Sequence, residues 1–491
     1  MPLDEKSVAG RHLEVSSMNS NTPPPLVVDL DGTLVRSDLL VETAFIFLGR
    51  RPHQIYKIVA WLFAGRASLK SKLAAEVGLD VSSLPYNQSV LASIVAARAQ
   101  GRRTYLASAS DERLVQAVAE HLNMFDGWYA SDGVNNLSRD VKAAKLTEQF
   151  GMNGYDYIGN EIADLPVWEN AHIRIVVNAS SSVEKRLAHK GLAFERLLSS
   201  RPSMGGWLKL IRPHQWIKNA LIVVPLLTAH QFIVNAYVHA ALAFAAFSLC
   251  ASSVYVLNDL VDIQADRQHP TKKNRPFASG TVPLLSGLAL VPLLLSCAFG
   301  IGYFVSLSFI GVLATYLVLA TAYTFSWKRK MLIDAITLAG LYTIRVIAGG
   351  VAIGVPISQW LLGFSMFHFL SLALIKRYSE MAIRFDAGLP DPTNRNYKAG
   401  DLPVIASLAA SSGYSAVIVF FLYLSSDAVR ALYRYPDILW LAGPLLLYWI
   451  SRMLMLSHRR LMHDDPIIFA LKDWVSLAIL GLIGVLGFVA L

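Results

Sequence analysis

Asn258-Asp259-Leu260-Val261-Asp262-Ile263-Gln264-Ala265-Asp266 directly follows a long apolar run in the second half of the chain. Carboxylates spaced three and four residues apart share one face of a helix. Ionisable groups at the rim of a bilayer are costly and usually bind an ion or a substrate. Three such acids can hold Mg²⁺, which takes carboxylate oxygens together with phosphate oxygens of its ligand. The stretch therefore predicts a Mg²⁺ site made by Asn258, Asp259, Asp262 and Asp266; a hydrated loop that merely carries acids is the alternative.

A cationic arm follows these acids, with the sequence Arg267-Gln268-His269-Pro270-Thr271-Lys272-Lys273-Asn274-Arg275-Pro276. Guanidinium and ammonium groups are the usual protein partners of phosphate oxygens. Acids for a metal and bases for phosphate stand side by side here at the end of an apolar run. Together they indicate a diphosphate site at a membrane surface.

The composition indicates a membrane protein with a soluble N-terminal part. Hydrophobic residues make up 54% of the 491 residues and charged residues only 16%. Residues 1 to about 200 are mixed and charged, whereas most of the remaining chain consists of apolar runs of roughly 17–23 residues, the length that spans a bilayer. We expect an all-α polytopic domain of about nine transmembrane helices. They lie near residues 219–235, 237–257, 283–304, 307–325, 332–352, 358–376, 403–425, 436–455 and 474–490. The first is the weakest, because His230 and Gln231 interrupt it.

The distribution of basic residues orients these helices. Loops after the second, fourth, sixth and eighth predicted spans carry clusters of Lys and Arg, whereas the opposite loops carry only Arg430 and Arg434. By the positive-inside rule, the basic loops, the acidic stretch and the N-terminal part face the cytoplasm, which predicts an integral protein of the cytoplasmic (inner) membrane. The net charge of +9 follows from the same rule, and no basic and aromatic motif points to nucleic acid as a partner.

The expected segments are a disordered tail at 1–25, a soluble domain at 26–195, an interfacial linker at 196–218 and a membrane domain at 219–491. The tail ends in Pro23-Pro24-Pro25 and has no apolar core or cleavage site, so we expect no signal peptide. Cys250 and Cys297 are the only cysteines and fall in apolar runs. A disulfide framework or a cysteine-based metal site is therefore not expected.

Leu26-Val27-Val28-Asp29-Leu30-Asp31-Gly32-Thr33-Leu34 is typical of an apolar strand that runs into a turn with two acids. This spacing lets Asp29 act as a nucleophile while Asp31 works as an acid and base. Gly32 and Thr33 can bring backbone N–H groups close to a phosphate. An ordinary strand followed by an Asp-Gly turn is the alternative.

Three later segments extend this pattern. Ser108 and Ser110 end a second strand, Lys142 lies in a helical stretch, and Tyr157-Ile158-Gly159-Asn160-Glu161-Ile162-Ala163-Asp164 is a third strand ending in acids. In this order the motifs resemble the haloacid dehalogenase-like phosphatase superfamily. The resemblance implies an α/β Rossmann-like fold with a small helical cap near residues 36–100. Within that cap the apolar and basic segment 55–63 could lie on the bilayer surface, but we expect it in the core of the cap.

The same resemblance assigns roles to single residues. Asp29 would form an aspartyl-phosphate, Asp31 would be the acid and base, and Ser108 and Lys142 would bind phosphate. The residues implied to hold Mg²⁺ are Asp29, Asp31, Asn160 and Asp164. The last motif of the family usually begins Gly-Asp, whereas this chain has Gly159-Asn160. An amide ligates Mg²⁺ without bringing a charge, so the activity of this domain stays open.

The second half resembles the UbiA-type intramembrane prenyltransferase superfamily. The resemblance rests on Arg212-Pro213-His214-Gln215-Trp216-Ile217-Lys218-Asn219, on Tyr255 through Asp266, and on His269-Pro270 and Arg275-Pro276. Within the superfamily, the polyprenyl-phosphate (decaprenyl-phosphate) phosphoribosyltransferase branch is the closest resemblance. The segments that support this branch are Tyr323 to Lys328, Asp334, Arg345, Lys376-Arg377-Tyr378-Ser379-Glu380 and Met462-His463-Asp464-Asp465-Pro466.

A departure from the aromatic-type members bears on the donor. Those members carry a second acidic motif after the sixth span, where this chain begins Lys376-Arg377-Tyr378. Cations in place of metal-holding acids argue for an additional phosphate on the donor. The resemblance thus implies phosphoribosyl diphosphate as donor and a polyprenyl phosphate in the membrane as acceptor.

The implied transfer depends on Mg²⁺. The catalytic acids Asp259, Asp262 and Asp266 would hold the metal against the donor's diphosphate while the anionic lipid phosphate attacks the ribose carbon. Since that oxygen is already charged, no general base is needed, and the protein mainly positions the reactants. The expected phosphate- and substrate-binding residues of both domains are Ser108, Lys142, Lys218, Asn258, Lys272, Arg275, Tyr323, Lys328, Arg345, Lys376 and Arg377. For the bases, plain positive-inside topology is the alternative.

The fusion of the two domains suggests a sequence of reactions. Phosphoribosyl transfer leaves a lipid-linked ribose with a 5-phosphate, which a phosphatase on the same chain could remove at high effective concentration. The main alternative is a prenyltransferase with an aromatic acceptor, of quinone or haem type, and a regulatory or degenerate phosphatase domain. A lipid-binding scaffold is disfavoured by the complete sets of acids.

Overall fold

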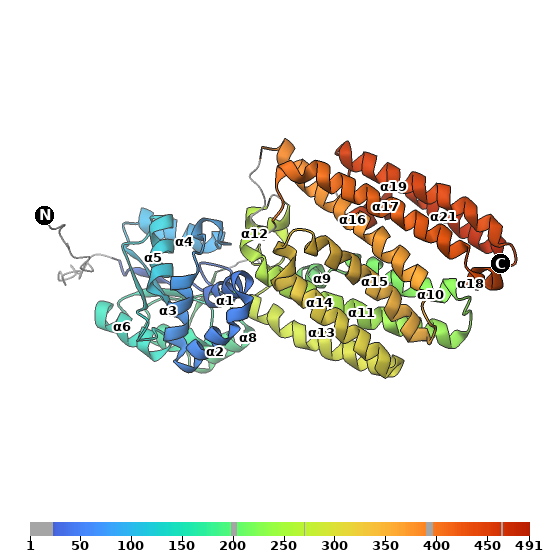
Figure 1. Cartoon of the computed structure of the whole chain (residues 1–491). Helices are drawn as coiled ribbons and strands as arrows, with labels where there is room; N and C mark the ends of the chain where they lie inside the picture. Colours follow the sequence, from blue (N-terminus) through green and yellow to red (C-terminus); the bar gives the residue numbers. More distant parts are fainter. Residues whose placement is uncertain (1–22, 198–203, 270, 389–395, 463–464) are drawn as a thin grey trace. The chain divides into compact units, whose positions relative to one another are not determined.

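The computed structural model describes residues 23–197, 204–269, 271–388, 396–462 and 465–491. Most of the predicted tail and residues 198–203 of the predicted linker lie outside these ranges. The described residues form two compact units, coloured along the chain in Figure 1. The first comprises those of Met1–Arg36, Ala64–Ala74 and Tyr86–Ser200, and the second those of Ser37–Phe63, Ala75–Pro85 and Arg201–Leu491.

The first unit is built around a parallel sheet. Within the described residues it has six strands in the order β3-β2-β1-β4-β5-β6, and every neighbouring pair is parallel. The strands are β1 (Leu26–Val28), β2 (Thr104–Asp111), β3 (Gly127–Ser131), β4 (Asp156–Gly159), β5 (Arg174–Val177) and β6 (Glu195–Leu197). The helices of this region are α3 (Arg66–Glu76), α4 (Gln88–Ala99), α5 (Glu112–Leu122), α6 (Asp140–Phe150), α7 (Leu165–Glu169) and α8 (Ser181–His189). The predicted α/β class of this domain is confirmed.

The strand order fixes where a site can form. The chain continues from β1 to β2 on one side of it and reaches β4 on the other, so the order reverses at β1. In such sheets ligands bind at the carboxyl ends of the strands where the order reverses. Leu26, Val27 and Val28 of β1 are almost fully buried, as expected for a strand covered on both faces. The residues after Val28 therefore stand at a rigid, central position.

Two helices of the predicted cap group with the second unit. They are α1 (Leu39–Arg50) and α2 (Ile55–Phe63). Val41 and Phe45 of α1 pack on an apolar cluster that includes Leu260, at the end of the first long membrane helix. All residues of α2 are at least partly exposed, and Phe63 is 89% exposed. The expectation that this segment forms cap core is wrong, because no residue of α2 is buried, although the ring of Trp61 lies 5.3 Å from that of Phe47.

Long apolar helices make up most of the second unit, and they run side by side as a bundle in Figure 1. They are α11 (Val234–Val261), α13 (Leu284–Val305), α14 (Leu307–Phe325), α15 (Ile333–Ile353), α16 (Gln359–Asp386), α17 (Leu402–Leu424), α19 (Ala442–His458) and α21 (Trp474–Ala490). Among the described residues, seven helices are long and apolar enough to cross a membrane, or eight if α21 is joined with the bent helix α20 (Pro466–Lys472). The expected count of about nine is therefore too high.

The first predicted span, 219–235, accounts for the difference. This region holds an irregular 3₁₀ stretch, η4 (Pro213–Val223), followed by the short helix α10 (Val224–Thr228). Pro225 lies in the first turn of α10, where its missing N–H is tolerated. His230 adopts a left-handed φ of 52°, which ends the helical run before α11 begins. Apolar composition suggested a span here, but the region holds only a 3₁₀ stretch and one short helix that ends before His230.

Candidate active sites

The first candidate site lies after β1 and brings the separate motifs of the first unit together. Lys142 of α6 places Nζ 2.8 Å from Asp29 Oδ1 and 3.3 Å from Asp164 Oδ1. Asp31 Oδ2 accepts hydrogen bonds from Ser110 Oγ at 2.6 Å and Ser108 Oγ at 3.2 Å. Residues more than seventy positions apart thus meet, because the carboxyl ends of β1, β2 and β4 share one edge of the sheet.

Burial gives this site unusual electrostatics. Loss of solvent raises the pKa of the Asp29 carboxyl to about 7, although the ammonium of Lys142 works against this. For Lys142 burial alone would lower the pKa, but the carboxylates of Asp29 and Asp164 outweigh it and raise the pKa. A buried lysine held charged between two carboxylates can neutralise an incoming phosphate. Lys145, the other lysine of α6, instead pairs with Glu148 on the surface.

Asn160 lies directly over the turn that carries the two acids. Its Oδ1 accepts a hydrogen bond from Thr33 Oγ1 at 3.2 Å, and Thr33 also donates to Asp29 Oδ2. A Cβ placed on Gly32 would come within 2.2 Å of Asn160 Nδ2, and Gly32 has a φ of +75°. Glycine is therefore required at this turn for both space and conformation. The hydroxyl of Thr33 thus connects the amide oxygen of Asn160 with the carboxylate of Asp29.

Tyr157 is a member of this site that was not among the predicted residues. Its hydroxyl donates to Asp164 Oδ1 at 2.7 Å and accepts from Lys142 Nζ at 2.9 Å. The signal was available, since residues 157 and 159 lie on the same face of β4 at the strand's carboxyl end. Ser110, which ends the second strand, was likewise passed over in favour of Ser108.

The second candidate site is formed by the acidic stretch, which does not lie on one helix. The helix α11 ends at Val261, Asp262 caps it, and Asp266 belongs to the short helix α12 (Ile263–Gln268). Asp259 Oδ1 and Asp266 Oδ2 share the guanidinium of Arg275, at 3.0 and 2.6 Å from Nη1. The expectation of one shared helical face is therefore wrong, and the break at Asp262 is what lets Asp266 turn back toward Asp259.

The third acid has a separate partner. Lys328 Nζ lies 2.6 Å from Asp262 Oδ1 and 3.1 Å from Asn258 Oδ1. Burial lowers the pKa of Lys328, and the nearby carboxylate of Asp262 opposes this. Burial also raises the pKa of Asp266 to about 6 against the effect of Arg275. Lys328 therefore belongs to the acidic end of this site and not to a separate phosphate clamp.

The acids of the second site have features of a cation site. Among the described residues, no three side chains of His, Cys, Asp and Glu are grouped as metal ligands. Two observations nevertheless favour a cation here: one guanidinium bridges Asp259 and Asp266, and the buried Asp259 Oδ2 finds no hydrogen-bond partner in the described part of the chain. An oxygen-only donor set of this kind suits Mg²⁺. In the first site, the ammonium of Lys142 similarly bridges Asp29 and Asp164.

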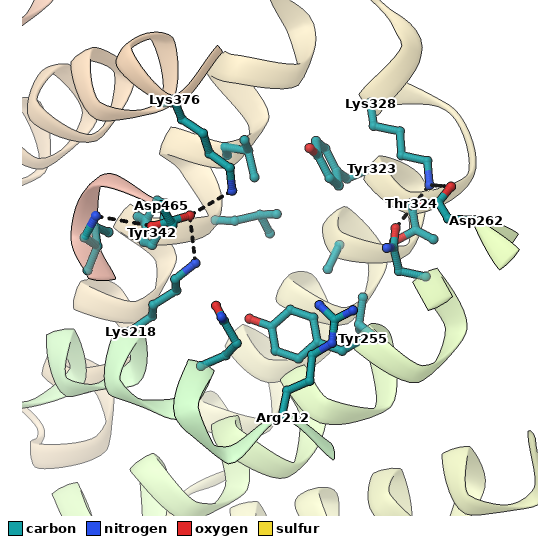
Figure 2. Close-up of a pocket in the computed structure, with 18 of the residues that line it drawn as sticks. Arg212, Lys218, Tyr255, Asp262, Tyr323, Thr324, Lys328, Tyr342, Lys376 and Asp465 are labelled. Atoms are coloured by element: carbon teal, nitrogen blue, oxygen red, sulfur yellow. Dashed lines mark hydrogen bonds and ion pairs between the residues drawn. The ribbon is translucent and has the colours of Figure 1, made fainter. Parts of the chain in front are cut away.

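A cavity of about 310 Å³ connects the acidic stretch to a second polar cluster. Figure 2 shows Lys328 and Asp262 on one side of this pocket and Lys218, Lys376 and Asp465 on the other. The wall between them includes aromatic and apolar side chains from α14, α15 and α16. They are Tyr316, Ala320, Tyr323, Leu338, Leu341, Tyr342, Leu372 and Ala373.

The second cluster consists of two lysines on one carboxylate. Lys218 and Lys376 lie 3.1 and 2.8 Å from Asp465 Oδ2, and Asp465 Oδ1 accepts the backbone N–H of Ile467 at the start of α20. Burial would raise the pKa of Asp465, but the two ammonium groups outweigh it and lower the pKa. Asp465 was not predicted as a site residue, although its segment contributed to the resemblance to phosphoribosyltransferases.

The remaining predicted cations divide into two kinds. Lys272 and Arg345 line the cavity; Arg345 is buried, lies over the ring of Tyr316 at 5.0 Å, and its Nε donates to the neutral oxygen of Asn219. Arg377 also reaches the cavity wall but is paired with Asp334 at 2.8 Å and with Glu380. Arg377 thus has two carboxylate partners of its own.

This architecture, a helical bundle around a polar cavity with aspartates at one end, defines an intramembrane transferase. The chain belongs to the UbiA prenyltransferase family, whose model matches residues 220–490. It is 37% identical to an uncharacterised protein of Sinorhizobium fredii over 459 residues. The aligned region covers 92% of this chain and 88% of that protein. A nodulation protein of Azorhizobium caulinodans is 35% identical over 279 residues, 55% of this chain and 89% of its own length.

A further relative has a named activity. The decaprenyl-phosphate phosphoribosyltransferase of Mycolicibacterium smegmatis is 38% identical over 185 residues, which is 37% of this chain and 58% of that enzyme's length. Among solved structures, a UbiA homolog from Archaeoglobus fulgidus bound to GPP and Mg²⁺ matches with a TM-score of 0.45 at 15% identity, over 58% of this chain and 99% of that one. A phosphoserine phosphatase structure matches 36% of this chain and 95% of its own, with a TM-score of 0.26 at 15% identity.

Proposed function

We propose that the second unit transfers 5-phosphoribose from phosphoribosyl diphosphate to a polyprenyl phosphate. The observation that carries this proposal is that one cavity is lined both by the acids Asp262 and Asp266 and by the lysines Lys218 and Lys376. The acidic end suits a metal-bound diphosphate, and the lysine end suits a second phosphate on the same substrate. A prenyl diphosphate carries no further phosphate beyond its diphosphate, so it has no group for the lysines to bind. The relatives named decaprenyl-phosphate phosphoribosyltransferase support the same choice.

The residues of the chain would act by charge and position. Mg²⁺ held by Asn258, Asp259, Asp262 and Asp266 would supply neutralising charge to the diphosphate. Arg212 and Arg275, which both contact Asp259, would bind oxygens of the diphosphate. The C1–O bond to diphosphate breaks, and a C1–O bond to the lipid phosphate forms. That phosphate oxygen is an anion before it attacks, so no proton has to be removed.

Tyr323 and Arg345 would complete the cavity around the sugar and the second phosphate. Both line the pocket, and Arg345 brings a buried charge whose hydrogen bonds go to neutral oxygens of Asn219, Leu341 and Tyr316. Lys272, on the arm after the acids, reaches the same pocket. These side chains are either positively charged or carry a hydroxyl group, and they stand among apolar residues. Such a lining favours an anionic sugar substrate.

The first unit would remove the 5-phosphate from the lipid product. Asp29 would attack the phosphorus, the P–O bond to the ribose would break, and Asp31 would protonate the leaving oxygen. Water would then attack the aspartyl-phosphate, with Asp31 taking its proton, which releases inorganic phosphate and restores Asp29. Ser108 and Lys142 would bind the phosphate, and Mg²⁺ would be held by Asp29, Asp31, Asn160 and Asp164. By the positive-inside rule, the basic loops support a cytoplasmic location for both active sites, at the inner membrane. The final product would be a polyprenylphosphoryl ribose.

One experiment separates this proposal from its main alternative. Purified full-length protein in detergent receives ribose-labelled phosphoribosyl diphosphate with polyprenyl phosphate, and separately a labelled prenyl diphosphate with 4-hydroxybenzoate, both with Mg²⁺. We expect label in the lipid fraction in the first mixture. Label transferred in the second mixture alone would identify an aromatic-acceptor prenyltransferase and reject the proposal. A sample treated with a chelator is the control for metal dependence.

A further inference from the structure

A buried ion pair of the second unit joins its α1 helix to the arm that follows the acidic stretch. Arg267 binds Glu42 through both terminal nitrogens, with Nη1 2.9 Å from Oε2 and Nη2 against Oε1. The two residues are 225 positions apart, and their side chains are 3% and 0% exposed. Ser37 Oγ also donates to Glu42. Such a bidentate pair fixes the orientation of both side chains.

Arg267 stands next to Asp266 and also braces the arm itself. Its Nε donates to the carbonyl of Ala278 at 3.1 Å. Ala278 lies three residues beyond Arg275, whose guanidinium bridges Asp259 and Asp266. One side chain therefore connects the beginning of the arm to a residue just after its end. The arm forms a loop in which Arg275 contacts the acids.

The helix α1 supplies apolar support at the same place. Val41 and Phe45, one residue before and three residues after Glu42, pack against a cluster that contains Leu260, Ile263 and Phe277. Leu260 and Ile263 lie on α11 and α12, the helices that bear Asp259 and Asp266, and Phe277 directly follows the arm. Glu42 is thus held rigidly on one side and holds Arg267 on the other.

We infer that Glu42 is a positioning residue of the transferase, acting through Arg267 on Asp266 and Arg275. The inference rests on the proposed function. Glu42 follows the aspartates of the phosphatase motif closely in sequence, yet it belongs to the membrane unit. The donor site of the transferase is then incomplete without a helix that is encoded before the phosphatase domain has ended. The two activities are joined in one chain for a structural reason as well as a metabolic one.

The test uses the full chain with Glu42→Gln, which keeps the side chain's size and removes its charge. We expect the donor KM to rise at least tenfold with a smaller change in kcat, because the substitution loosens donor binding and leaves the reacting atoms in place. Hydrolysis of p-nitrophenyl phosphate by the first unit should be unchanged, and Glu42→Asp should recover part of the donor affinity. Glu76→Gln is the matched control, since Glu76 pairs with Arg51 at the surface.

A second variant separates positioning from simple stability. Glu42→Met with Arg267→Met removes both buried charges together, which usually preserves folding. We expect this double variant to melt like the parent and still show the raised donor KM, because the brace to Ala278 is lost. Full recovery of transfer, or an unchanged KM in Glu42→Gln, overturns the inference.

The outcome can be told apart from a failure of the proposed function. If the parent transfers only prenyl groups to 4-hydroxybenzoate, the same variants are assayed on that reaction, since any diphosphate donor would use Asp266 and Arg275. A raised KM for the prenyl diphosphate would then uphold the role of Glu42 and reject phosphoribosyl transfer.

Discussion

Lys218 and Lys376 donate to the same oxygen, Oδ2 of Asp465, over 3.1 and 2.8 Å. Two ammonium groups against one carboxylate leave an excess of positive charge at this end of the cavity. At the opposite end, Asp259, Asp262 and Asp266 are met by Arg212, Arg275 and Lys328. A substrate with a diphosphate at one end and a monophosphate at the other matches this distribution of charge.

Loss of either lysine should weaken donor binding. A hydrogen bond to a charged group contributes about 1.5–3 kcal/mol, so Lys218→Met or Lys376→Met should raise the donor KM roughly tenfold to hundredfold. The KM is measured with labelled phosphoribosyl diphosphate at saturating lipid. Lys330→Met, at an exposed position outside the cavity, is the control. Equal KM values for all three variants would show that Lys218 and Lys376 do not bind the donor.

Replacement of Asp259 should stop the transfer. Asp259→Asn removes the carboxylate that meets Arg212 and Arg275, and it removes a charge from the expected metal site. We expect at least a hundredfold lower transfer rate, about 2.7 kcal/mol in the barrier. Hydrolysis of p-nitrophenyl phosphate should not change. Asp427→Asn, an exposed acid, serves as control, and transfer at the parental rate in Asp259→Asn would contradict the metal site.

Asp29→Asn should separate the two activities. Without the nucleophile the lipid product should keep its 5-phosphate, which mass spectrometry of the extracted lipid detects as one additional phosphate. The rate of label transfer from the donor should remain parental, because the acids of the second unit are untouched. Glu148→Gln, which alters an exposed pair with Lys145, should give the dephosphorylated lipid. Dephosphorylated lipid from Asp29→Asn would mean that another group performs the hydrolysis.

Asn160 offers a test by gain of function. Asn160→Asp adds a carboxylate beside Asp29 and Thr33, at the position where the family usually has one. The added charge should lower the Mg²⁺ concentration needed for half-maximal hydrolysis of p-nitrophenyl phosphate. Binding of Mg²⁺ itself, followed by calorimetry, should tighten in parallel. If Asn160→Asp and Asn160→Ala share the parental Mg²⁺ requirement, Asn160 is not near the metal.

The sequence predicted the first site better than the second for a physical reason. In a parallel sheet the carboxyl ends of strands share one edge, so local motifs after β1, β2 and β4 meet without knowledge of the loops. Tyr157, near the end of β4, could have been found in this way, whereas Lys142 on α6 was expected from the resemblance to the phosphatases. The second site depends on a helix break at Asp262 and on an arm that folds back through Arg275. Neither feature follows from helical periodicity, which placed all three acids on one face.

Long-range partners were the least accessible from sequence. Lys218 and Asp465 are 247 residues apart, and Glu42 and Arg267 are 225 apart. Only packing of the helices brings such residues together, and a single sequence carries no signal for it. The overestimated span at 219–235 has a related origin, because hydropathy measures composition while a span also needs an unbroken helix. The helix α10 ends there at Thr228, and His230 adopts a left-handed φ.

The exposed helix α2 leads to a last prediction. It belongs to the unit that contains the apolar spans, its Ile55, Val59, Leu62 and Phe63 are exposed, and Arg50 and Arg51 precede it. An apolar face flanked by cations binds at the surface of an anionic bilayer. A spin label on Phe63→Cys, in protein lacking Cys297, should therefore be more accessible to oxygen than to a water-soluble nickel complex in vesicles with anionic lipid. A label at Val134→Cys, an exposed site of the first unit, should show the opposite preference. Equal accessibility at both positions would mean that α2 faces water, and its apolar residues would then need a protein partner.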